Sequence, residues 1–389
     1  MVNKKIHRHP RKQPPPQPEA GTQRQTRHQE QGLQTHAHAH VSVQVEIRHQ
    51  QRLLDLFCTA LRPALDSPDL PALLHDVKQA LFDRDFARAF GHEGHLGAYA
   101  VRWSPTRALC YAAILRSGVV RECLDDLLLT GRHAAASASV TEAREEGVGE
   151  VSTEEVSTNE QVVPEGAALR MIAIGGCAAE QVAFASLLHN ASISGTLTLL
   201  DSGPWTQVVN LLQDAITTAP PLSKYASAAV KETHAPLVPA SRLSLSFQQM
   251  NILVEPERLA LFSEKGKPVL VTLFFTLNEL YTSGGIAQTT RFMAALEKIL
   301  PRRSLLLVVD SPGSYSMAAL GKENKRYPMQ WLLDHTLRDP KRETPSWERL
   351  ETQDSVWFRL SKELSYPLQL EDMRYQIHLY RLRVEDGEK

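Results

Sequence analysis

The residues best suited to chemistry follow apolar runs in the second half of the chain. Gly175, Gly176 and Cys177 come directly after RMIAI, and a small-residue stretch, AAEQVAF, begins behind them. Glycines permit a tight turn and the close approach of a ligand, and the N-terminus of a helix presents free N–H groups. Such a turn suits a dinucleotide or the adenosyl and methionine parts of S-adenosylmethionine. The spacing GxGxxG is absent because Cys177 stands at the second glycine position, which weakens the dinucleotide interpretation.

Polar residues also end the next two apolar runs. Asp201 ends LTLLD, and its spacing from Gly175 is close to the ~20 residues at which an acidic residue accepts hydrogen bonds from a ribose. The alternative role is an N-cap for a helix that begins near Pro204, and both roles can coexist. Asn251 follows the next run, at the place of a polar contact to adenine, although it could be an ordinary loop asparagine. Together, the glycine turn and Asp201 favour a cofactor that contains adenosine.

A fourth apolar run, LVTLFF, predicts a strand that ends in a polar loop. Thr276, Asn278, Glu279 and Tyr281 follow it, and we expect them to face the active site. Packing gives no reason for Asn-Glu directly after a buried strand, although these residues could instead cap the next helix. A fifth run, LLLVV, ends in a polar loop that begins at Asp310. These positions suggest one shared rim of polar residues.

The elements that must position this rim alternate from about residue 168 onward. Apolar runs of strand length are followed by segments with apolar residues at helical spacing, such as AAEQVAFASLLHN and PWTQVVNLLQDAITT. Strands that alternate with helices predict an α/β fold with a mostly parallel, Rossmann-like sheet. In such a sheet, ligands bind outside the carboxyl ends of the strands. The last runs, VWFRLS and MRYQIHLYRLR, have no helical pattern between them and predict an antiparallel hairpin at one edge.

Three further segments precede this domain, which we place at 168–389. Residues 1–50 are rich in His, Gln, Arg and Pro and predict a disordered basic arm, suited to nuclear import or loose RNA contact unless it is only a solvated tail. Residues 51–130 predict a helical module, in which Ser104 is an N-cap and Pro105 opens a helix. Residues 131–167 are acidic and predict a flexible linker.

Composition excludes several classes of protein. The 389 residues include no run of eighteen apolar residues, so we expect no transmembrane helix. Cys58, Cys110, Cys123 and Cys177 are scattered, which indicates reduced thiols of an intracellular protein and no zinc site. We expect no metal at the HAHAH run of the arm either. The P-loop, GxSxG and HExxH motifs are absent.

Taken as an ordered series, the motifs resemble a known family. IGGCAAE, LTLLDSGPW, LVTLFFTLNELYTSG, LLLVVDSPGSYS and YPLQLEDMRYQIHLYRLR resemble the fungal 25S ribosomal RNA uracil-N3 methyltransferases, and YAVRWSPTRALCYAAIL resembles their Arg-Trp-Ser-Pro element. The resemblance implies a class I, S-adenosylmethionine-dependent fold with seven strands, the last antiparallel. It also implies a substrate in ribosomal RNA, in the nucleus or nucleolus. The departures are Cys177 in place of a motif glycine and Asn251 where an acidic residue is common.

Methylation of uracil N3 defines roles for the rim residues. N3 becomes nucleophilic only when its proton leaves, so a base must lie within hydrogen-bond reach. We expect Glu279 to be that base and Asn278 to orient the uracil. The cofactor-binding residues that we expect are Gly175, Gly176, Cys177, Asp201, Asn251 and Thr276. The RNA-binding residues that we expect are Arg102, Trp103, Phe275, Tyr281 and Arg374, although Trp103 could instead be a core anchor.

The same interpretation of the sequence predicts the cofactor, the partners and the location. We expect S-adenosylmethionine as the cofactor, ribosomal RNA within a pre-60S particle as the partner, no membrane, no metal and a monomer. The expected location is the nucleus and nucleolus, with the cytoplasm as a second site. Two alternatives stay open: a methyltransferase-fold binding protein that assists ribosome assembly without catalysis, and a methyltransferase that acts on another RNA or a small molecule.

Overall fold

The computed structural model describes residues 43–145, 168–222, 224, 225, 227, 234–264, 266–313, 315–320, 323–338 and 346–384; at 132–145, 315–320 and 323–327 only the backbone is described. The predicted arm, with its HAHAH run, lies outside the described residues as far as residue 42, and so does the predicted linker from residue 146 onward. The chain consists of two compact units, Met1–His49 and Gln50–Lys389. Residues 43–49 of the first unit are helical. The second unit contains all the elements discussed below.

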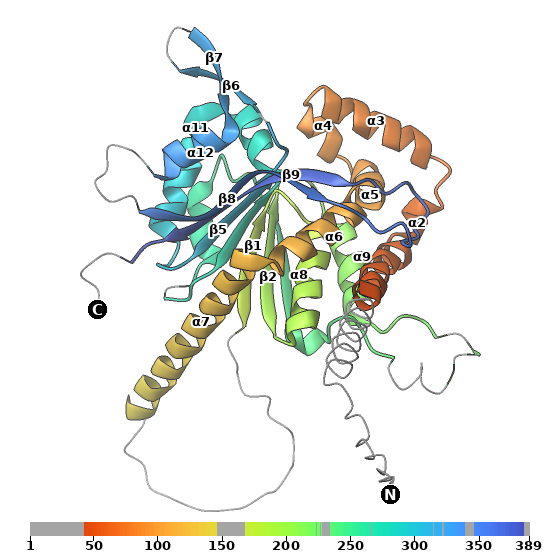
Figure 1. Ribbon diagram of the computed structural model, residues 1–389, viewed down its shortest axis with the longest axis horizontal. Helices are drawn as coiled ribbons and strands as arrows, with labels where there is room; N and C mark the ends of the chain where they lie inside the picture. Colours follow the sequence, from red (N-terminus) through yellow and green to blue (C-terminus); the bar gives the residue numbers. More distant parts are fainter. Residues whose placement is uncertain are drawn as a thin grey trace, which may run out of the picture. The chain divides into compact units, whose positions relative to one another are not determined.

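A seven-stranded sheet lies at the centre of the second unit, with the strand order β3-β2-β1-β4-β5-β9-β8 (Figure 1). The first five strands are mutually parallel, and β9 pairs antiparallel with both β5 and β8. This arrangement confirms the predicted class I sheet and the antiparallel pair of late strands. The bounds are β1 (Leu169–Ile174), β2 (Gly195–Asp201), β3 (Leu243–Gln249), β4 (Leu270–Phe274), β5 (Leu305–Asp310), β8 (Trp347–Phe358) and β9 (Met373–Leu382).

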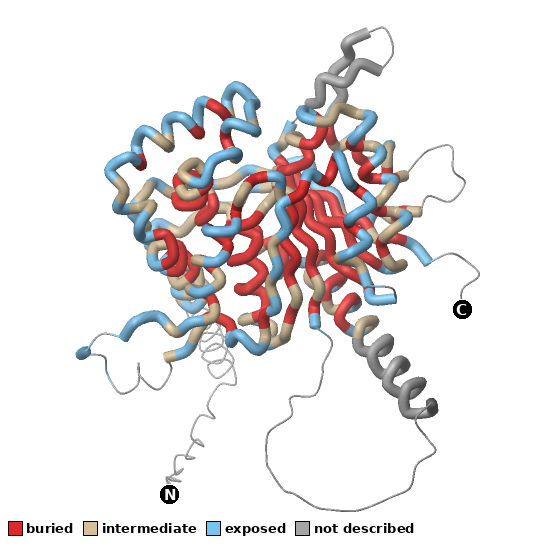
Figure 2. The backbone as a smooth tube through the Cα atoms, turned by 180° about the vertical axis from the view of Figure 1, so that it is seen from behind, coloured by how far each residue is buried: buried red, intermediate tan, exposed pale blue. Residues whose placement is uncertain are grey.

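Helices cover both faces of the sheet because side chains alternate along its strands. On β1, Met171 and Ala173 belong to one hydrophobic core, and Ile172 and Ile174 belong to the other. Figure 1 shows α6, α8 and α9 on one side of the sheet and α11 and α12 on the other. The buried positions in Figure 2 gather in the central strands and in the helices against them. The bounds are α8 (Ala178–Ala191), α9 (Thr206–Thr217), η2 (Pro256–Phe262), α11 (Leu277–Ile299) and α12 (Met329–Leu337).

The N-terminal helices share the core of the sheet domain. Tyr111 and Ile114 of α6 are buried with Phe184 of α8 and Met171 of β1 in one cluster. The helical segment therefore forms one unit with the sheet and can line a site at its edge. It contains a helix through residues 50–60, followed by α2 (Arg62–Leu65), α3 (Leu70–Phe82), α4 (Phe86–Phe90), α5 (Glu93–Arg102), α6 (Ser104–Leu115) and α7 (Gly118–Glu145).

Two boundaries in this segment differ from the predictions. α6 begins at Ser104, and Trp103 occupies the N-cap position without a side-chain cap, so Ser104 is not the N-cap. The proline at the start of the helix occupies a position where its missing N–H costs nothing. Helix α7 continues to Glu145, beyond residue 131, where we expected the linker to begin.

The segment after β4 is helical, whereas we predicted a polar loop. Helix α11 begins at Leu277 and kinks at Gly285, where φ is 65°. The Asp310 carboxylate accepts a hydrogen bond from the Asn278 N–H at 3.1 Å and so stabilises the first turn. A small hairpin, β6 (Tyr315–Leu320) and β7 (Glu323–Pro328), was also not predicted.

This helical turn corrects the expected role of Tyr281. Tyr281 comes four positions after Leu277, so both side chains point to the same side of α11. Tyr281 is 4% exposed and belongs to the core cluster that includes Phe292 and Leu333. Its ring therefore stabilises the fold and does not stack on a base.

Truncation of this ring tests the correction. We expect Tyr281→Ala to lower the free energy of unfolding by about 3–5 kcal/mol, because it removes a buried aromatic ring. Tyr281→Phe, which keeps the ring, should stay within about 1.5 kcal/mol of the wild type. Urea unfolding followed by circular dichroism measures both. A Tyr281→Ala protein with wild-type stability would contradict the assignment to the core.

Candidate functional site

Two adjoining pockets lie at the carboxyl ends of β1, β2 and β4. They share Phe90, Gly175, Asp201 and Glu279. The wide pocket encloses about 1090 Å³, including its open mouth, and also takes in Gly203, Met250, Asn251 and Thr276. The inner pocket encloses about 460 Å³ and also takes in Tyr99, Arg107, Gly176, Cys177, Glu180 and Phe275. The position agrees with the rule that ligands bind outside the carboxyl ends of parallel strands.

The turn after β1 requires its glycines. Gly175 has a φ of 74°, and a Cβ at this position would overlap the side chain of Thr276. The Thr276 hydroxyl lies 3.0 Å from the Gly175 carbonyl oxygen and 3.1 Å from that of Ile174. Thr276 therefore borders the wide pocket but uses its hydroxyl to hold the turn. A Cβ on Gly176 would overlap the carboxylate of Glu180, so both glycines leave room for side chains of the site.

Asp201 lies where a ribose contact was predicted. One carboxylate oxygen accepts a hydrogen bond from the Gly203 N–H at 2.7 Å, inside the loop after β2. Helix α9 begins at Thr206 with Trp205 in the N-cap position, so Asp201 is not the N-cap. Burial raises the pKa of Asp201 to about 6, although hydrogen bonds from Gly203 and Trp205 act in the opposite direction. A carboxylate offers several lone pairs, so Asp201 keeps the capacity to accept a further hydrogen bond from a ligand.

Asn251 lines the wide pocket, on the loop after β3. Its side-chain oxygen accepts a hydrogen bond from the Leu253 N–H at 3.0 Å, which shapes the loop. An adenine contact from this residue, which stays a prediction, would come from the amide group or from the second lone pair of that oxygen.

Two more carboxylates lie on the inner pocket. Burial and the negative charge of Asp201 raise the pKa of Glu279 to about 8, against the opposing effect of Arg107. Burial likewise raises the pKa of Glu180 to about 7. Desolvation disfavours the charged form of a carboxylate, and carboxylates close together disfavour each other's ionisation. The pocket is therefore built to favour a positively charged ligand, and it holds acids that can exchange protons near neutral pH.

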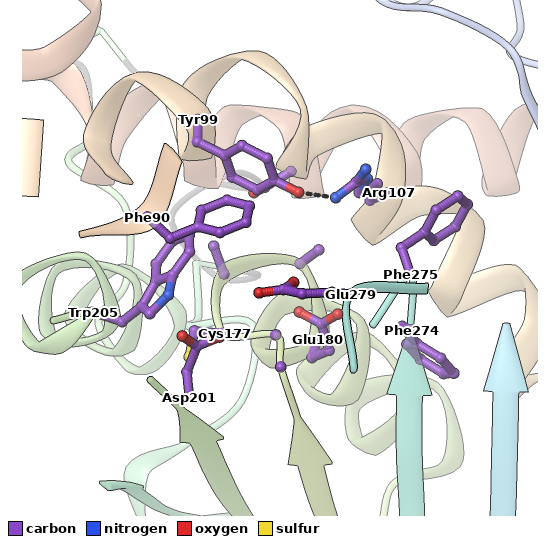
Figure 3. Close-up of a pocket in the computed structure, with 15 residues that line it drawn as sticks. Phe90, Tyr99, Arg107, Cys177, Glu180, Asp201, Trp205, Phe274, Phe275 and Glu279 are labelled. Atoms are coloured by element: carbon purple, nitrogen blue, oxygen red, sulfur yellow. Dashed lines mark hydrogen bonds between the residues drawn. The ribbon is translucent and has the colours of Figure 1, made fainter. Parts of the chain in front are cut away.

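A single cation, Arg107, stands opposite these acids on the inner pocket. Its guanidinium donates a hydrogen bond to the Tyr99 hydroxyl and lies over two aromatic rings, with its Cζ atom 5.3 Å from the Tyr99 centroid and 4.8 Å from the Phe275 centroid. Figure 3 shows Arg107 and Tyr99 across the pocket from Glu279 and Glu180, with Phe90 and Trp205 at one side and Phe274 and Phe275 at the other.

An outer pocket adjoins the inner one through Arg107 and Phe275. It brings together four of the predicted RNA-binding residues, Arg102, Trp103, Phe275 and Arg374. The Arg102 guanidinium forms an ion pair with Glu371. The Nε of Arg374 donates to the Ser355 hydroxyl at 2.8 Å, and its guanidinium lies 5.7 Å from the ring centroid of Trp357.

The predicted residues therefore divide into four groups, of which the four at the outer pocket are the first. The structure brings together at the two pockets Gly175, Gly176, Cys177, Asp201, Asn251, Thr276 and Glu279. Asn278 borders none of the three pockets, and its backbone N–H donates to Asp310 while its backbone carbonyl accepts from the Thr282 hydroxyl at 2.7 Å. Its expected role of orienting the uracil is not supported by this placement. Tyr281, as shown above, lies in the core.

The sequence analysis missed several lining residues. Phe90, Tyr99 and Arg107 belong to α4, α5 and α6, and nothing in their local sequence shows that these helices reach the sheet edge. Glu180 gave a usable signal, since it is a lone acid in the first turn of a helix that is otherwise apolar or small at its start. An acid buried there needs either a partner or a function.

Alanine at the glycine turn tests its geometry. We expect Gly175→Ala to lower both the stability of the protein and its affinity for S-adenosylhomocysteine. The added Cβ would overlap Thr276, and a residue with a Cβ is strained at positive φ. Gly266 has a φ of 73° and open space at its Cβ position, so Gly266→Ala should cost only about 1–2 kcal/mol of strain. Thermal unfolding of both variants, each with and without S-adenosylhomocysteine, measures the difference. Equal loss in both variants would contradict the close packing of Gly175 on Thr276.

Two features of other protein classes are not found in the described part of the chain. None of its helices is long and apolar enough to cross a membrane. The described residues also contain no group of three or more His, Cys, Asp or Glu side chains placed to hold a metal ion.

The chain is similar to several known proteins. The chain is similar to the 25S rRNA (uridine(2843)-N(3))-methyltransferase of Saccharomyces cerevisiae, with 26% identity over 352 residues that cover 85% of each protein. Among solved structures, it aligns with an S-adenosylmethionine-dependent methyltransferase of Methanosarcina mazei (9% identity, 56% of this chain, 94% of that chain, TM-score 0.31). It also aligns with a mutant of the 16S rRNA (adenine(1408)-N(1))-methyltransferase of Catenulisporales acidiphilia (12% identity, 57% of this chain, 87% of that chain, TM-score 0.30).

A family model settles the affiliation. The family described as "Putative SAM-dependent methyltransferase" matches residues 57–381, which include most of the helical segment, the glycine turn and the seven strands of the sheet except for the last residue of β9. S-adenosylmethionine is the cofactor of this family, in agreement with the glycine turn and Asp201. The chain belongs to this family of S-adenosylmethionine-dependent methyltransferases.

Proposed function

We propose that this chain methylates N3 of a uridine in large-subunit ribosomal RNA. The resemblance of its motifs and the name of its yeast relative support the substrate. The single structural observation that carries the chemistry is Glu279, a largely buried carboxylate that borders both the wide and the inner pocket and has a pKa raised to about 8. A base for uracil N3 needs this combination of access to the cofactor pocket and a pKa near the working pH.

The residues of the two pockets fit S-adenosylmethionine. Gly175 and Gly176 lie on the inner pocket and allow Thr276 and Glu180 to pack closely against the turn. Asp201 lies at the end of β2, where a ribose is bound in related folds. Glu180 and Glu279 favour a positively charged ligand, and S-adenosylmethionine carries positive charge on its sulfonium and on its amino group. When bound, S-adenosylmethionine supplies a methyl group whose bond to sulfur breaks as the bond to N3 forms, with the electron pair left on sulfur.

Within this reaction, the residues of the chain position the uracil and move one proton. The N3–H of the uracil donates its proton to the Glu279 carboxylate, which becomes a neutral acid and later releases the proton to water. The freed electron pair on N3 forms the new bond. Phe275 and Tyr99 provide ring surfaces at the inner pocket, and the base must be unpaired or flipped from a duplex to enter.

The outer pocket is the entrance that we propose for RNA. Arg102, Trp103 and Arg374 line it and adjoin the inner pocket through Phe275. Arginine and aromatic side chains are typical of surfaces that bind single-stranded RNA. We further propose that the partner is a pre-60S particle and that the active form is a monomer. The location that we propose is the nucleus and nucleolus, with the cytoplasm as a second site.

Nucleoside mass spectrometry tests this function directly. Large-subunit ribosomal RNA from cells that lack the protein should contain less 3-methyluridine than RNA from wild-type cells, and the wild-type gene should restore the amount. An unchanged amount would contradict the substrate. In that event, measurable transfer of methyl groups to other RNA or to small molecules would favour another substrate. If no such transfer is measured, a binding protein without catalysis would be favoured.

Glu279→Gln tests the base. Only the carboxylate form accepts a proton, so the wild-type single-turnover rate should rise with pH up to the pKa of Glu279 and then level off. We expect Glu279→Gln to lower the rate by about 10²–10⁴-fold, the usual contribution of a general base, and to lose this dependence. The control is the affinity for S-adenosylhomocysteine, measured by calorimetry, which should be retained because this ligand lacks the sulfonium charge. A Glu279→Gln rate equal to that of the wild type would exclude Glu279 as the base.

A further inference from the structure

Neither cofactor binding nor the removal of the N3 proton uses one charged residue of the site, Arg107. Arg107 borders both the inner pocket, which holds the cofactor residues, and the outer pocket, which we propose for RNA. Of the lining residues of these two pockets, only Arg107 and Phe275 belong to both. A uracil that enters through the outer pocket and reaches the cofactor must therefore pass or contact these two side chains.

Arg107 is fixed by aromatic rings and not by an acid. None of the ion pairs formed between described residues includes Arg107, whereas Arg102 pairs with Glu371 at the outer pocket. The Arg107 guanidinium instead rests on Tyr99 and Phe275 and donates one hydrogen bond to the Tyr99 hydroxyl. A guanidinium carries five N–H donors, so this arrangement holds the group in place and leaves donors for a ligand.

The ring beneath Arg107 is itself held in a costly conformation. Phe275 has a φ of 57°, in the left-handed region, and its N–H donates to the Val309 carbonyl at 2.7 Å. A bulky residue at positive φ costs of order 1–3 kcal/mol and persists where the surrounding structure imposes it, most often at functional sites. This turn at the end of β4 places the Phe275 ring against Arg107 and starts the helix that carries Glu279.

The charge of Arg107 acts on the same groups that surround the reacting atom. It lowers the pKa of Glu279, Glu180 and Asp310, in each case against the larger effect of burial. The guanidinium is therefore close enough to the proposed base to act on a ligand between them. Figure 3 shows this opposed arrangement, with Arg107 on one side of the pocket and Glu279 on the other.

The chemistry of uracil supplies a use for such a cation. When N3 loses its proton to Glu279, the negative charge spreads over N3 and the two flanking carbonyl oxygens. A planar guanidinium is suited to an oxygen that gains charge, and in a pocket with little water this stabilisation is stronger than in solution. Because methylation takes place at N3 itself, the cation must act at a carbonyl oxygen and leave N3 open.

We propose, on the basis of the proposed function, that Arg107 is a second catalytic residue, whose guanidinium contacts a carbonyl oxygen next to N3 of the target uracil and stabilises the anion formed when Glu279 accepts the N3 proton. Arg107 then makes N3–H more acidic, and Glu279 removes the proton. In this step one proton moves from N3 to the Glu279 carboxylate, which becomes neutral. The electron pair of the N–H bond stays on the uracil, which becomes negatively charged.

The acidity of N3 can be measured without methyl transfer. The probe is an RNA oligonucleotide that spans the uridine identified by mass spectrometry, with 5-fluorouridine at that position, bound to the full-length chain and S-adenosylhomocysteine. The ¹⁹F chemical shift followed against pH reports the ionisation of N3. In the wild-type complex we expect the N3 pKa to lie about 1–3 below that of the free oligonucleotide, the usual effect of a close opposite charge.

Three variants make the measurement specific. Arg107→Gln should restore the pKa of the free oligonucleotide, and Arg107→Lys, which keeps the charge, should retain part of the lowering. Glu279→Gln should keep the lowering, since it removes no positive charge. The control is Arg121→Gln on α7, whose wild-type guanidinium pairs with Asp125 away from the three pockets, and it should match the wild type.

Two results would overturn the proposal. One is an N3 pKa in the Arg107→Gln complex that stays as low as in the wild type. The other is a large loss of S-adenosylhomocysteine affinity in both Arg107→Gln and Arg107→Lys, which would assign Arg107 to the cofactor or the fold. The failure of the proposed function is a separate outcome, since it appears as unchanged 3-methyluridine in cells that lack the protein and overturns both proposals.

Discussion

The site depends on the contact between the turn after β1 and the end of β4. Gly175 has no Cβ, and the Thr276 side chain occupies the space that a Cβ would fill. This contact fixes the distance between the two strand ends, and the Thr276 hydroxyl satisfies the backbone oxygens of the turn. The chain after Gly175 leads into α8, which carries Glu180. The chain after Thr276 leads into α11, which carries Glu279. The positions of both acids follow from one close packing.

The electrostatics of the pocket follow from its burial. Three carboxylates, Asp201, Glu180 and Glu279, lie on the inner pocket with one guanidinium, and all three have raised pKa values. The burial of these charged groups is costly, because each charge has lost water without gaining a full partner. A positively charged ligand offsets that cost. The same desolvation gives Glu279 a pKa at which it can both accept and release a proton near neutral pH.

Much of the sheet domain could be predicted from the sequence. The strands are apolar runs with a polar residue at the carboxyl end, so the position of Gly175 and Asp201 at one edge follows from parallel topology alone. The predictions failed where a local sequence pattern was compatible with both a loop and a helix. TLNELYTSGG has the composition of a loop, but Asp310, distant in sequence, stabilises its first turn as a helix, and Tyr281 consequently lies in the core.

The contribution of α4, α5 and α6 to the inner pocket could not be predicted from their local sequence. Their amphipathic pattern shows that they pack, but not that α4, α5 and α6 reach the edge of the sheet. Phe90, Tyr99 and Arg107 therefore gave no signal as site residues, although they form one wall of the inner pocket. Gly203 shows how close this approach is, since a Cβ there would lie 2.7 Å from the carbonyl oxygen of Phe90. Contacts of this kind arise from tertiary packing and leave little trace in a single sequence.

The measurement that tests the central claim most directly is the binding of S-adenosylhomocysteine to the purified full-length chain and to its Asp201→Ala variant, followed by calorimetry. If the two pockets form the cofactor site, the wild type binds one molecule. The variant, which loses a hydrogen bond to a charged group worth about 1.5–3 kcal/mol, should then bind about 10–150-fold more weakly. Absence of binding to the wild type, or equal affinity of the two proteins, would contradict the account.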